Sequence, residues 1–270
     1  NGNIFAKRPF LPQTFRNCPH GILRGAVDGG GWHHRQCADG CDIDDVAGAA
    51  RRHFRQNGGD AVQHARPAVN VAALVGHTAL RQNHMDRLDR AASAAEISAM
   101  RAQLRESLAQ GALGLSSGLA YASAFDAPSA EVAELAAELP AGGLYATHLR
   151  DEFAGILAAM EEAFDAARAP QAGVRVSHLK CAGIDNWGRS HQVLDCLQSA
   201  SATQDVACDC YPYAASASTL DLKQVTDAFD ILITWSEAEP GQGGRLLAEI
   251  AADWNLSLMD AAIRLQPAGA

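Results

Sequence analysis

Five short apolar runs recur along the chain at intervals that constrain its fold class. The runs are residues 69–75, 112–115, 144–149, 174–179 and 205–210. The residues that close them, spaced by 39, 32, 30 and 33 positions, are His77, Ser116, His148, His178 and Tyr211. Each interval accommodates one strand and one crossover helix, which is what consecutive parallel strands require. The spacing predicts an α/β fold, either a barrel or a doubly wound sheet.

Two of the intervening stretches have the periodicity of amphipathic helices. In residues 151–169 the large apolar side chains recur at helical spacing, and Pro170 follows as a stop signal. Residues 89–110 carry a similar apolar stripe, with Gly111 as the terminator. We expect both helices to cover the sheet from the outside.

The charge of the chain favours small-molecule ligands. Its 270 residues include 22 Lys and Arg against 31 Asp and Glu, a formal net charge of −9. No basic surface is expected to pair with phosphates, which argues against nucleic-acid and anionic-membrane partners. No apolar stretch approaches the roughly 20 residues of a membrane span. The oligomeric state stays open.

The first part of the chain differs in character from the rest. Residues 1–64 are rich in Gly, Arg, Asp, Cys and His, and we interpret them as an irregular or divergent segment. The alternation of apolar runs and amphipathic stretches occupies residues 65–270, where we expect a partial barrel domain. Seven cysteines without framework spacing favour reduced thiols and a cytoplasmic location. The chain begins at Asn1 rather than Met, which leaves room for a missing amino terminus.

Two histidines stand at equivalent places in successive strand-helix units. His148 lies at the end of LYATHL and His178 at the end of VRVSHL. Because the carboxyl ends of parallel strands meet at one edge of a sheet, we expect the two imidazoles within about 7 Å of each other. The pair predicts a shared zinc site. The alternative for each histidine is a hydrogen-bonded core residue.

Longer segments around these positions point to a known family. They are NVAALVGHTALR (70–81), GALGLSSGLAY (111–121), YATHLRDE (145–152), VSHLKCAG (176–183) and DCYPYAAS (209–216). These segments resemble the D-aminoacylases, the N-acyl-D-amino-acid deacylases of the amidohydrolase superfamily. The resemblance implies a (β/α)8 TIM-barrel-like metal-dependent hydrolase, here as an incomplete barrel. It also implies Zn²⁺ held by a Cys and two His, and cleavage of N-acyl-D-amino acids to a carboxylate and a free D-amino acid.

The resemblance assigns roles to individual residues. His148 and His178 match the two histidine ligands of the family. Lys180, in a motif similar to SHxK, would bind the substrate carboxylate together with Tyr211, and Tyr121 is a further candidate for the same pocket. The alternative for Tyr211 is a hydroxyl that caps the core. Strand alternation places residues two apart on the same side, so Lys180 should point toward the histidines.

The family's third metal ligand is a cysteine in an Asn-Cys-Gly turn. The nearest match is Asn17-Cys18-Pro19, which no apolar strand precedes. Cys18 is therefore either the ligand or a free thiol in a loop. A second Cys/His group in residues 33–41 lacks a matched pair and is interpreted as accidental. In residues 208–210 we interpret the two thiols as small core residues that face away from the carboxylate between them.

Two positions near the predicted site are assigned supporting roles. His77, in GHTALR, is expected to act next to the metal ligands or to be structural. Arg150 could brace the site from the segment after His148. The acidic residues Asp151 and Glu152 are explained by the preference of helix starts for negative charge.

Two features of the family are missing from this sequence. It contains no His-x-His triplet, and it ends at LQPAGA without a Ser-Asp-Gly segment, whose aspartate would activate water. Amide hydrolysis needs a general base, and Asp185 and Asp209 are the only acids we place near the site. We therefore expect an incomplete chain, truncated or frameshifted, that is weakly active or inactive.

Two other functions stay open. The first is a non-catalytic folded or metal-binding remnant, whose incomplete barrel would leave open sheet edges. The second is a cyclic-amide hydrolase of the hydantoinase kind, which generally bridges two metals through a carboxylated lysine. Lys180 is the one lysine near a predicted strand end, and its motif assigns it to substrate binding. The acyl group and the side chain that the enzyme prefers are not predicted.

Overall fold

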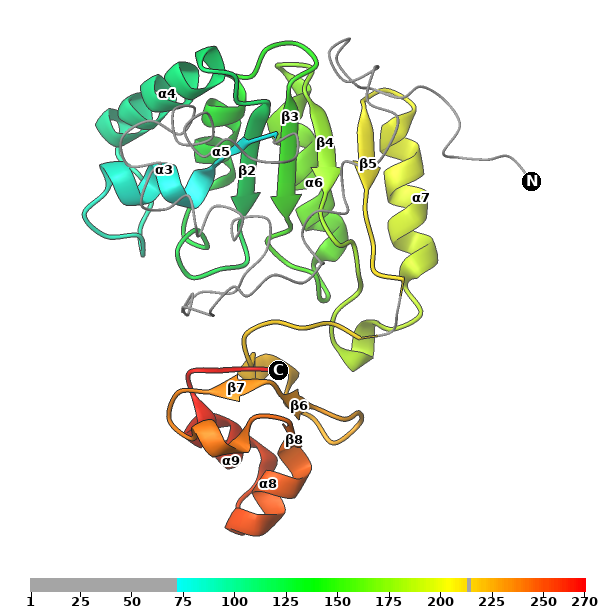
Figure 1. The fold of residues 1–270 in the computed structure, drawn as a ribbon. Coiled ribbons are helices and arrows are strands. Elements are labelled where there is room, and N and C mark those ends of the chain that lie inside the picture. Colours follow the sequence, from blue (N-terminus) through cyan, green and yellow to red (C-terminus); the bar gives the residue numbers. More distant parts are fainter. Residues whose placement is uncertain (1–71, 213–214) are drawn as a thin grey trace.

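The central element of the protein is a parallel sheet of five strands (Figure 1). The computed structural model describes residues 72–212 and 215–270. The strands follow one another in sequence order: β1 (Leu74–Gly76), β2 (Gly114–Gly118), β3 (Leu144–His148), β4 (Gly173–Val176) and β5 (Val206–Cys208). Each neighbouring pair is parallel. The order has no reversal, which is typical of a (β/α)8 barrel and not of a doubly wound sheet.

Helices connect the strands and form an outer layer (Figure 1). They are α3 (His77–His84), α4 (Ala94–Ala109), α5 (Ser129–Ala136), α6 (Ile156–Arg168) and α7 (Ser190–Ser201), and the short 3₁₀ helix η3 (Ile184–Asn186) precedes α7. Each helix packs against the next, from α3 on α4 to α6 on α7. The prediction that outer helices cover the sheet is confirmed.

The two helices expected from periodicity are present, with later starts than expected. Helix α4 begins after Ser93, whose side chain accepts from the Glu96 amide in a capping box, and it buries Met100 and Leu104 completely. Helix α6 begins at Ile156 and not near residue 151. The apolar stripes therefore gave the correct buried faces, and the amino-terminal bounds were wrong.

The strands are also shorter than the apolar runs. Ser116 lies inside β2, His77 is the first residue of α3, and Tyr211 lies beyond the end of β5. The pairing of β3 with β4 ends at Val176, two residues before His178. Beyond that point the backbone leaves the extended conformation, with His178 at φ +39°.

Two glycines have a clear structural reason. A side chain at Gly114 would meet the Leu144 backbone oxygen at 1.9 Å, so only glycine allows β2 and β3 to approach this closely. Gly111 follows the end of α4 with φ +105°, a conformation that residues with a side chain rarely adopt. The predicted helix terminator is therefore confirmed.

The carboxyl-terminal residues pack around a second hydrophobic cluster. Its secondary structure consists of β6 (Leu232–Ile233) paired with β8 (Arg245–Leu246), β7 (Trp235–Ser236) paired with β9 (Ala268–Gly269), and helices α8 (Leu247–Trp254) and α9 (Leu258–Leu265). Leu220, Ile250 and Leu265 are buried in this cluster. The proposed division at residue 64 stays a prediction, because that boundary lies outside the described residues. Among the described helices, none has the length and hydropathy needed to cross a membrane.

Candidate metal centre

The predicted histidine pair lies at one end of the parallel sheet. His148 is the last residue of β3, and His178 follows β4, the neighbouring strand. His148 Nδ1 lies 3.0 Å from His178 Nε2, and the ring centroids are 4.6 Å apart in an edge-on arrangement. The expected proximity of about 7 Å or less is confirmed. Both side chains are largely buried, His178 more completely.

Asp209 holds His178 in its unusual backbone conformation. Its Oδ1 accepts the His178 backbone N–H at 2.5 Å, and its backbone oxygen accepts the Leu179 N–H at 2.8 Å. The Asp209 N–H in turn donates to the Val176 oxygen at 3.2 Å. The loop after β5 therefore fixes the turn that carries His178. Asp209 is a positioning residue that the sequence analysis considered only as a substitute base.

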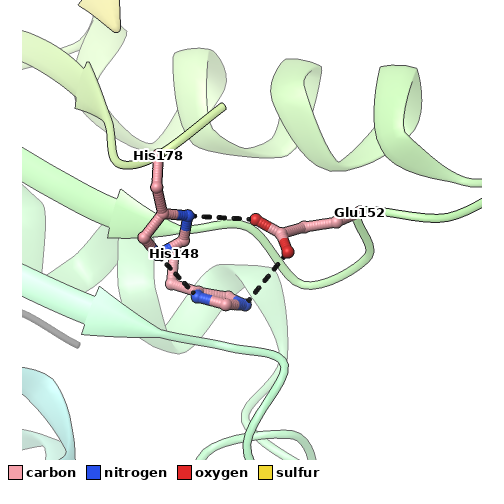
Figure 2. Close-up of side chains that lie close together, drawn as sticks. All are labelled: His148, Glu152 and His178. Atoms are coloured by element: carbon pink, nitrogen blue, oxygen red, sulfur yellow. Dashed lines mark hydrogen bonds and ion pairs between the residues drawn. The ribbon is translucent and has the colours of Figure 1, made fainter. Parts of the chain in front are cut away.

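Glu152 joins the two histidines, as Figure 2 shows. Its Oε1 lies 3.2 Å from His178 Nδ1, and its Oε2 lies 3.7 Å from His148 Nε2. These three side chains form a group that could hold a metal ion. Burial by itself raises the pKa of Glu152, but the hydrogen bond from His178 and the positive charges of His148 and Lys180 outweigh it and leave the pKa lowered.

The interpretation of Glu152 as a helix-start acid is wrong. Residues 150–152 belong to the segment before α6, where the Asp151 carboxylate accepts the Phe153 N–H at 2.6 Å. This local turn leaves the Glu152 side chain pointing into the site. The Glu152 backbone oxygen also accepts the Ala182 N–H at 2.8 Å, which ties it to the segment after β4. Gly155, directly before the apolar helix residues, was the available sequence signal for a later helix start.

Lys180 lies at the site, as predicted. Its Nζ is 2.7 Å from Glu152 Oε2, 2.8 Å from Glu152 Oε1 and 2.9 Å from His178 Nδ1. The reason given for this position was wrong, since β4 ends at Val176 and strand alternation does not extend to Lys180. The turn at His178 and the ion pair with Glu152 place the ammonium group instead.

Two tyrosines border the histidine pair. The Tyr121 hydroxyl is 3.3 Å from His148 Nδ1, and the Tyr211 ring centroid is 6.1 Å from that of His178. Lys180 Nζ lies 5.7 Å from the Tyr211 ring centroid. Both predicted tyrosines are therefore near the same site, and their roles in substrate binding stay predictions.

The two supporting residues make contacts within the protein scaffold. His77 is fully buried, and its Nε2 lies 2.9 Å from Glu131 Oε1, which also accepts from Arg81. Arg150 donates to the Glu162 carboxylate and to the backbone oxygens of Phe125 and Ala127. Arg150 therefore ties the segment after β2 to helix α6. Neither residue has a direct contact with the histidine pair among those that the structure describes.

The remaining predictions concern the cysteines and Asp185. Cys18 and the Cys/His group of residues 33–41 lie outside the described residues. Asp185 lies in the short η3 helix and is exposed, and it does not belong to the group of His148, Glu152 and His178 that could hold a metal ion. Cys208 is partly buried against the core, as interpreted, whereas Cys210 is exposed and its assignment to the core was wrong. The strand ends at Cys208, so alternation no longer applies to the second thiol.

The donor set suits a divalent transition metal. Two ligand nitrogens about 2.0–2.1 Å from a tetrahedral zinc ion lie about 3.3 Å apart. The 3.0 Å between His148 Nδ1 and His178 Nε2 is close to this separation. A buried carboxylate next to the opposite ring nitrogens is the usual surrounding of such ligands. The pair lies at the carboxyl end of the parallel sheet, which is the face where (β/α)8 barrels carry their active sites.

Comparison with known proteins identifies the family. No family model matches the chain. It is 43% identical over 212 residues to a D-aminoacylase of Alcaligenes xylosoxydans xylosoxydans, covering 78% of this chain and 44% of the relative. It is 47% identical over 205 residues to the N-acyl-D-aspartate deacylase of the same organism, covering 75% of this chain and 41% of the relative. The chain thus spans less than half the length of these relatives.

Solved structures agree with the sequence comparison. A crystal structure of D-aminoacylase, described as defining a novel subset of amidohydrolases, matches with a TM-score of 0.72 at 42% identity, covering 80% of this chain and 46% of the other. The N-acyl-D-glutamate deacylase of Bordetella bronchiseptica, complexed with zinc and a phosphonate inhibitor, matches with a TM-score of 0.73 at 40% identity, covering 78% and 45%. The chain belongs to the D-aminoacylase family of amidohydrolases, and the predicted (β/α)8 fold is confirmed.

Proposed function

We propose that the protein is a zinc-dependent amidohydrolase that cleaves N-acyl-D-amino acids to a carboxylate and a free D-amino acid. The observation that carries this proposal is the His148 and His178 pair at the carboxyl end of adjacent parallel strands, with Lys180 beside it. The similar deacylase that was solved with zinc and a mimic of the tetrahedral intermediate supports both the metal and the reaction. The substrate class follows from the names of the relatives.

The proposed site contacts the substrate at two points, its scissile carbonyl and its carboxylate. A zinc ion on His148 and His178, with Cys18 as the proposed third ligand, supplies a Lewis acid that polarises the scissile carbonyl. Lys180 supplies the positive charge for the substrate carboxylate, and the nearby Tyr211 offers a hydroxyl to the same group. Fixing the carboxylate and the carbonyl separately orients the amide and selects one hand at the carbon between them.

Proton transfer is the step with the least support among the described residues. The Asp209 carboxylate accepts the His178 backbone N–H, and Glu152 is paired with Lys180. Both acids near the histidines are therefore engaged in holding other groups. We propose that the 270-residue chain by itself is weakly active or inactive, because amide hydrolysis without a positioned general base is slow.

Zinc binding and stereoselective hydrolysis test this function together. We expect the purified chain to bind zinc, and His148→Ala and His178→Ala to lose that binding. His191→Ala is the matched control, because His191 lies exposed on α7 and contacts the Gly188 oxygen. Hydrolysis of N-acetyl-D-methionine, compared with the L-isomer, then measures activity. A chain that binds no zinc, or a zinc form that hydrolyses both isomers at equal, measurable rates, would contradict the proposal.

A second candidate function has one observation in its favour. The acids beside the histidine pair hold other groups, Asp209 the His178 backbone N–H and Glu152 the Lys180 ammonium, which favours a folded metal-binding protein without turnover. Zinc binding with no hydrolysis at any enzyme concentration would support that candidate. A hydantoinase-like bimetal site has less support, because the Lys180 ammonium is paired with Glu152. The cytoplasmic location is part of the proposal, and the free thiols of Cys181 and Cys196 are compatible with it.

A further inference from the structure

We propose that Arg150 is a positioning residue for the loop between β2 and α5, residues 119–128, which carries Tyr121. By holding this Tyr121 loop, Arg150 sets the place of the Tyr121 hydroxyl beside His148. The inference rests on the proposed function, in which Tyr121 is a candidate substrate contact. It adds the residue that fixes this contact.

The Tyr121 loop has few means of fixing its own position. It consists of turns, in which the Ala124 and Phe125 N–H groups donate to the Tyr121 backbone oxygen at 2.9 and 2.8 Å. These bonds fold the loop on itself and give it no direction relative to the sheet. Leu119 donates its N–H to the His148 oxygen at 3.3 Å, which fixes only the start of the loop. The position of Tyr121 therefore depends on directed contacts further along.

Arg150 supplies two such contacts. Its Nη1 donates to the Phe125 backbone oxygen at 2.6 Å, and its Nη2 donates to the Ala127 backbone oxygen at 2.8 Å. Hydrogen bonds from a charged donor are short and about twice as strong as neutral ones. Arg150 comes two residues after His148, the last residue of β3. The loop is therefore fastened to the strand end that carries His148, and this sets the 4.8 Å between the ring centroids of Tyr121 and His148.

The guanidinium group of Arg150 is itself held in one orientation. Glu162 on α6 accepts from Arg150 Nε at 2.9 Å and from Nη2 at 2.7 Å, which makes a two-point contact. Ser129, the first residue of α5, donates its hydroxyl to Glu162 Oε1 at 2.7 Å. The side chains of Arg150 and Glu162 are only 22% and 13% exposed. A lysine would keep the charge but would lack the planar fork that reaches the carboxylate and both carbonyl oxygens.

Arg81 holds the same loop from another side. Its Nε donates to the Ser123 backbone oxygen at 3.2 Å. Two arginines thus hold the Tyr121 loop, one from α3 and one from the end of β3. Arg81 is fully buried and paired with Glu131, so its replacement would disturb the core. Arg150 is therefore the residue whose replacement tests the loop separately.

A displaced Tyr121 hydroxyl would matter for the proposed reaction. Groups that bind the substrate act by holding it in one geometry, and a misplacement of about 1 Å can cost about 10²-fold in rate. Loss of the Arg150 contacts should therefore resemble loss of the Tyr121 hydroxyl itself.

Hydrogen exchange measures the loop directly in the 270-residue chain. We expect Arg150→Lys to speed amide exchange in residues 119–128 by about 10–100-fold and to leave β3 unchanged, because hydrogen bonds from a charged group are lost. Ser129→Ala, which frees Glu162 from one contact, is a milder variant and should give a smaller increase. Arg168→Lys is the matched control, because Arg168 lies 62% exposed on α6 and pairs with Asp165.

A fluorine signal follows the tyrosine itself. The chain has four tyrosines, so 3-fluorotyrosine labelling gives four resonances, and Tyr121→Phe identifies the resonance of Tyr121. We expect Arg150→Lys to shift or broaden this resonance and to leave that of Tyr211 unchanged. A change that only reflected lower overall stability would not single out Tyr121.

Ligand binding connects the loop to the proposed function. Calorimetry with N-acetyl-D-methionine compares the zinc-loaded wild type, Tyr121→Phe, Arg150→Lys and the double variant. We expect each single variant to bind about tenfold more weakly. The double variant should bind no more weakly than Tyr121→Phe, because both changes remove the same contact.

The contrary results separate the two proposals. Unchanged loop exchange in Arg150→Lys and Ser129→Ala, or an unchanged Tyr121 resonance in Arg150→Lys, would overturn the positioning role whether or not the chain binds a substrate. Additive losses in the double variant would show that Arg150 does not act through Tyr121, which also overturns it. A wild-type chain that binds zinc but no N-acetyl-D-methionine would contradict the proposed function, and the exchange and fluorine results would still decide the role of Arg150.

Discussion

Replacing Glu131 by Gln should strongly destabilise the parallel-sheet part of the protein. Glu131 lies on α5 with a fully buried side chain. Its Oε1 accepts from His77 Nε2 at 2.9 Å and from the buried Arg81 guanidinium, and its Oε2 accepts the Ala92 N–H at 3.0 Å. The substitution removes the charge that compensates Arg81 and leaves a buried cation without its partner.

The magnitude follows from the pKa of the carboxyl group. Burial raises the pKa of Glu131, but hydrogen bonds from His77, the Ala92 amide and Arg81 lower it from 4.5 to about 2. A difference of about 2.5 in pKa corresponds to about 3 kcal/mol of stabilisation at pH 7. Breaking a buried ion pair by removing one partner gives a similar loss of about 3–5 kcal/mol. We therefore expect the free energy of unfolding to fall by about 3 kcal/mol.

Urea unfolding followed by circular dichroism measures this loss. A decrease of about 3 kcal/mol shifts the midpoint by about 1 M urea or more. Because the folded pKa lies below the unfolded one, the stabilisation is present above pH 4.5 and is lost as the pH falls toward 2. The difference between wild type and variant should accordingly shrink to about 1 kcal/mol at pH 3.

A neighbouring acid on the same helix provides the control. Glu134 is half exposed and lies 3.8 Å from Arg101, so Glu134→Gln should change stability by only about 0–1 kcal/mol. Equal losses in Glu131→Gln and Glu134→Gln, or a pH-independent difference, would refute the argument that the buried network stabilises the fold.

Three further predictions concern the site. In a complete enzyme of this family, Lys180→Ala should raise KM for N-acyl-D-amino acids more than it lowers kcat, with the circular dichroism spectrum unchanged; an unchanged KM would refute the carboxylate contact. Asp209→Ala should weaken zinc binding by about tenfold or more, since it removes the acceptor of the His178 N–H and a hydrogen bond to a charged group contributes about 1.5–3 kcal/mol, whereas Asp205→Ala, at a surface partner of Arg175, should not. The 270-residue chain with zinc should turn over N-acetyl-D-methionine about 10²–10⁴-fold more slowly than an ordinary enzyme; turnover of roughly 1–10³ per second would refute this.

The sequence predicted the parallel sheet because spacing carries topological information. Intervals of about thirty residues between apolar runs leave room for one crossover helix, and the observed strand order follows directly. The ends of the elements were less accessible. Helix α6 begins at Ile156 because Asp151 forms a local turn with Phe153, and an apolar stripe alone does not reveal where such a turn ends. The second cluster around Ile250 was not foreseen, because short antiparallel pairs leave little periodic signal.

The sequence also predicted the histidine pair and Lys180, and it missed the acid that connects them. Glu152 is four residues after His148, and the preference of helix starts for negative charge was taken to explain it. Only the turn before α6 brings it back to the site. Asp209 was missed as a support for a similar reason, since its role depends on the positive φ of His178. Both acids act through tertiary contacts that a linear pattern does not encode.

Lys180 contacts Glu152 directly, and it contacts His178, which Asp209 holds. Both acids therefore bear on the position of the proposed substrate contact. An ammonium group has three donors, and that of Lys180 reaches both Glu152 oxygens and His178 Nδ1. A substrate carboxylate in the proposed site would therefore compete with one of these contacts. A substrate carboxylate that accepts from this ammonium would lie close to His178, whose Nδ1 is 2.9 Å from the same Nζ. In the proposed site, Asp209 holds the turn of His178 and Glu152 holds Lys180, so the scaffold would set the distance between the carboxylate contact and the metal. A site of this kind discriminates substrates by the length and hand of the link between carboxylate and amide, which is the property that an N-acyl-D-amino-acid hydrolase needs.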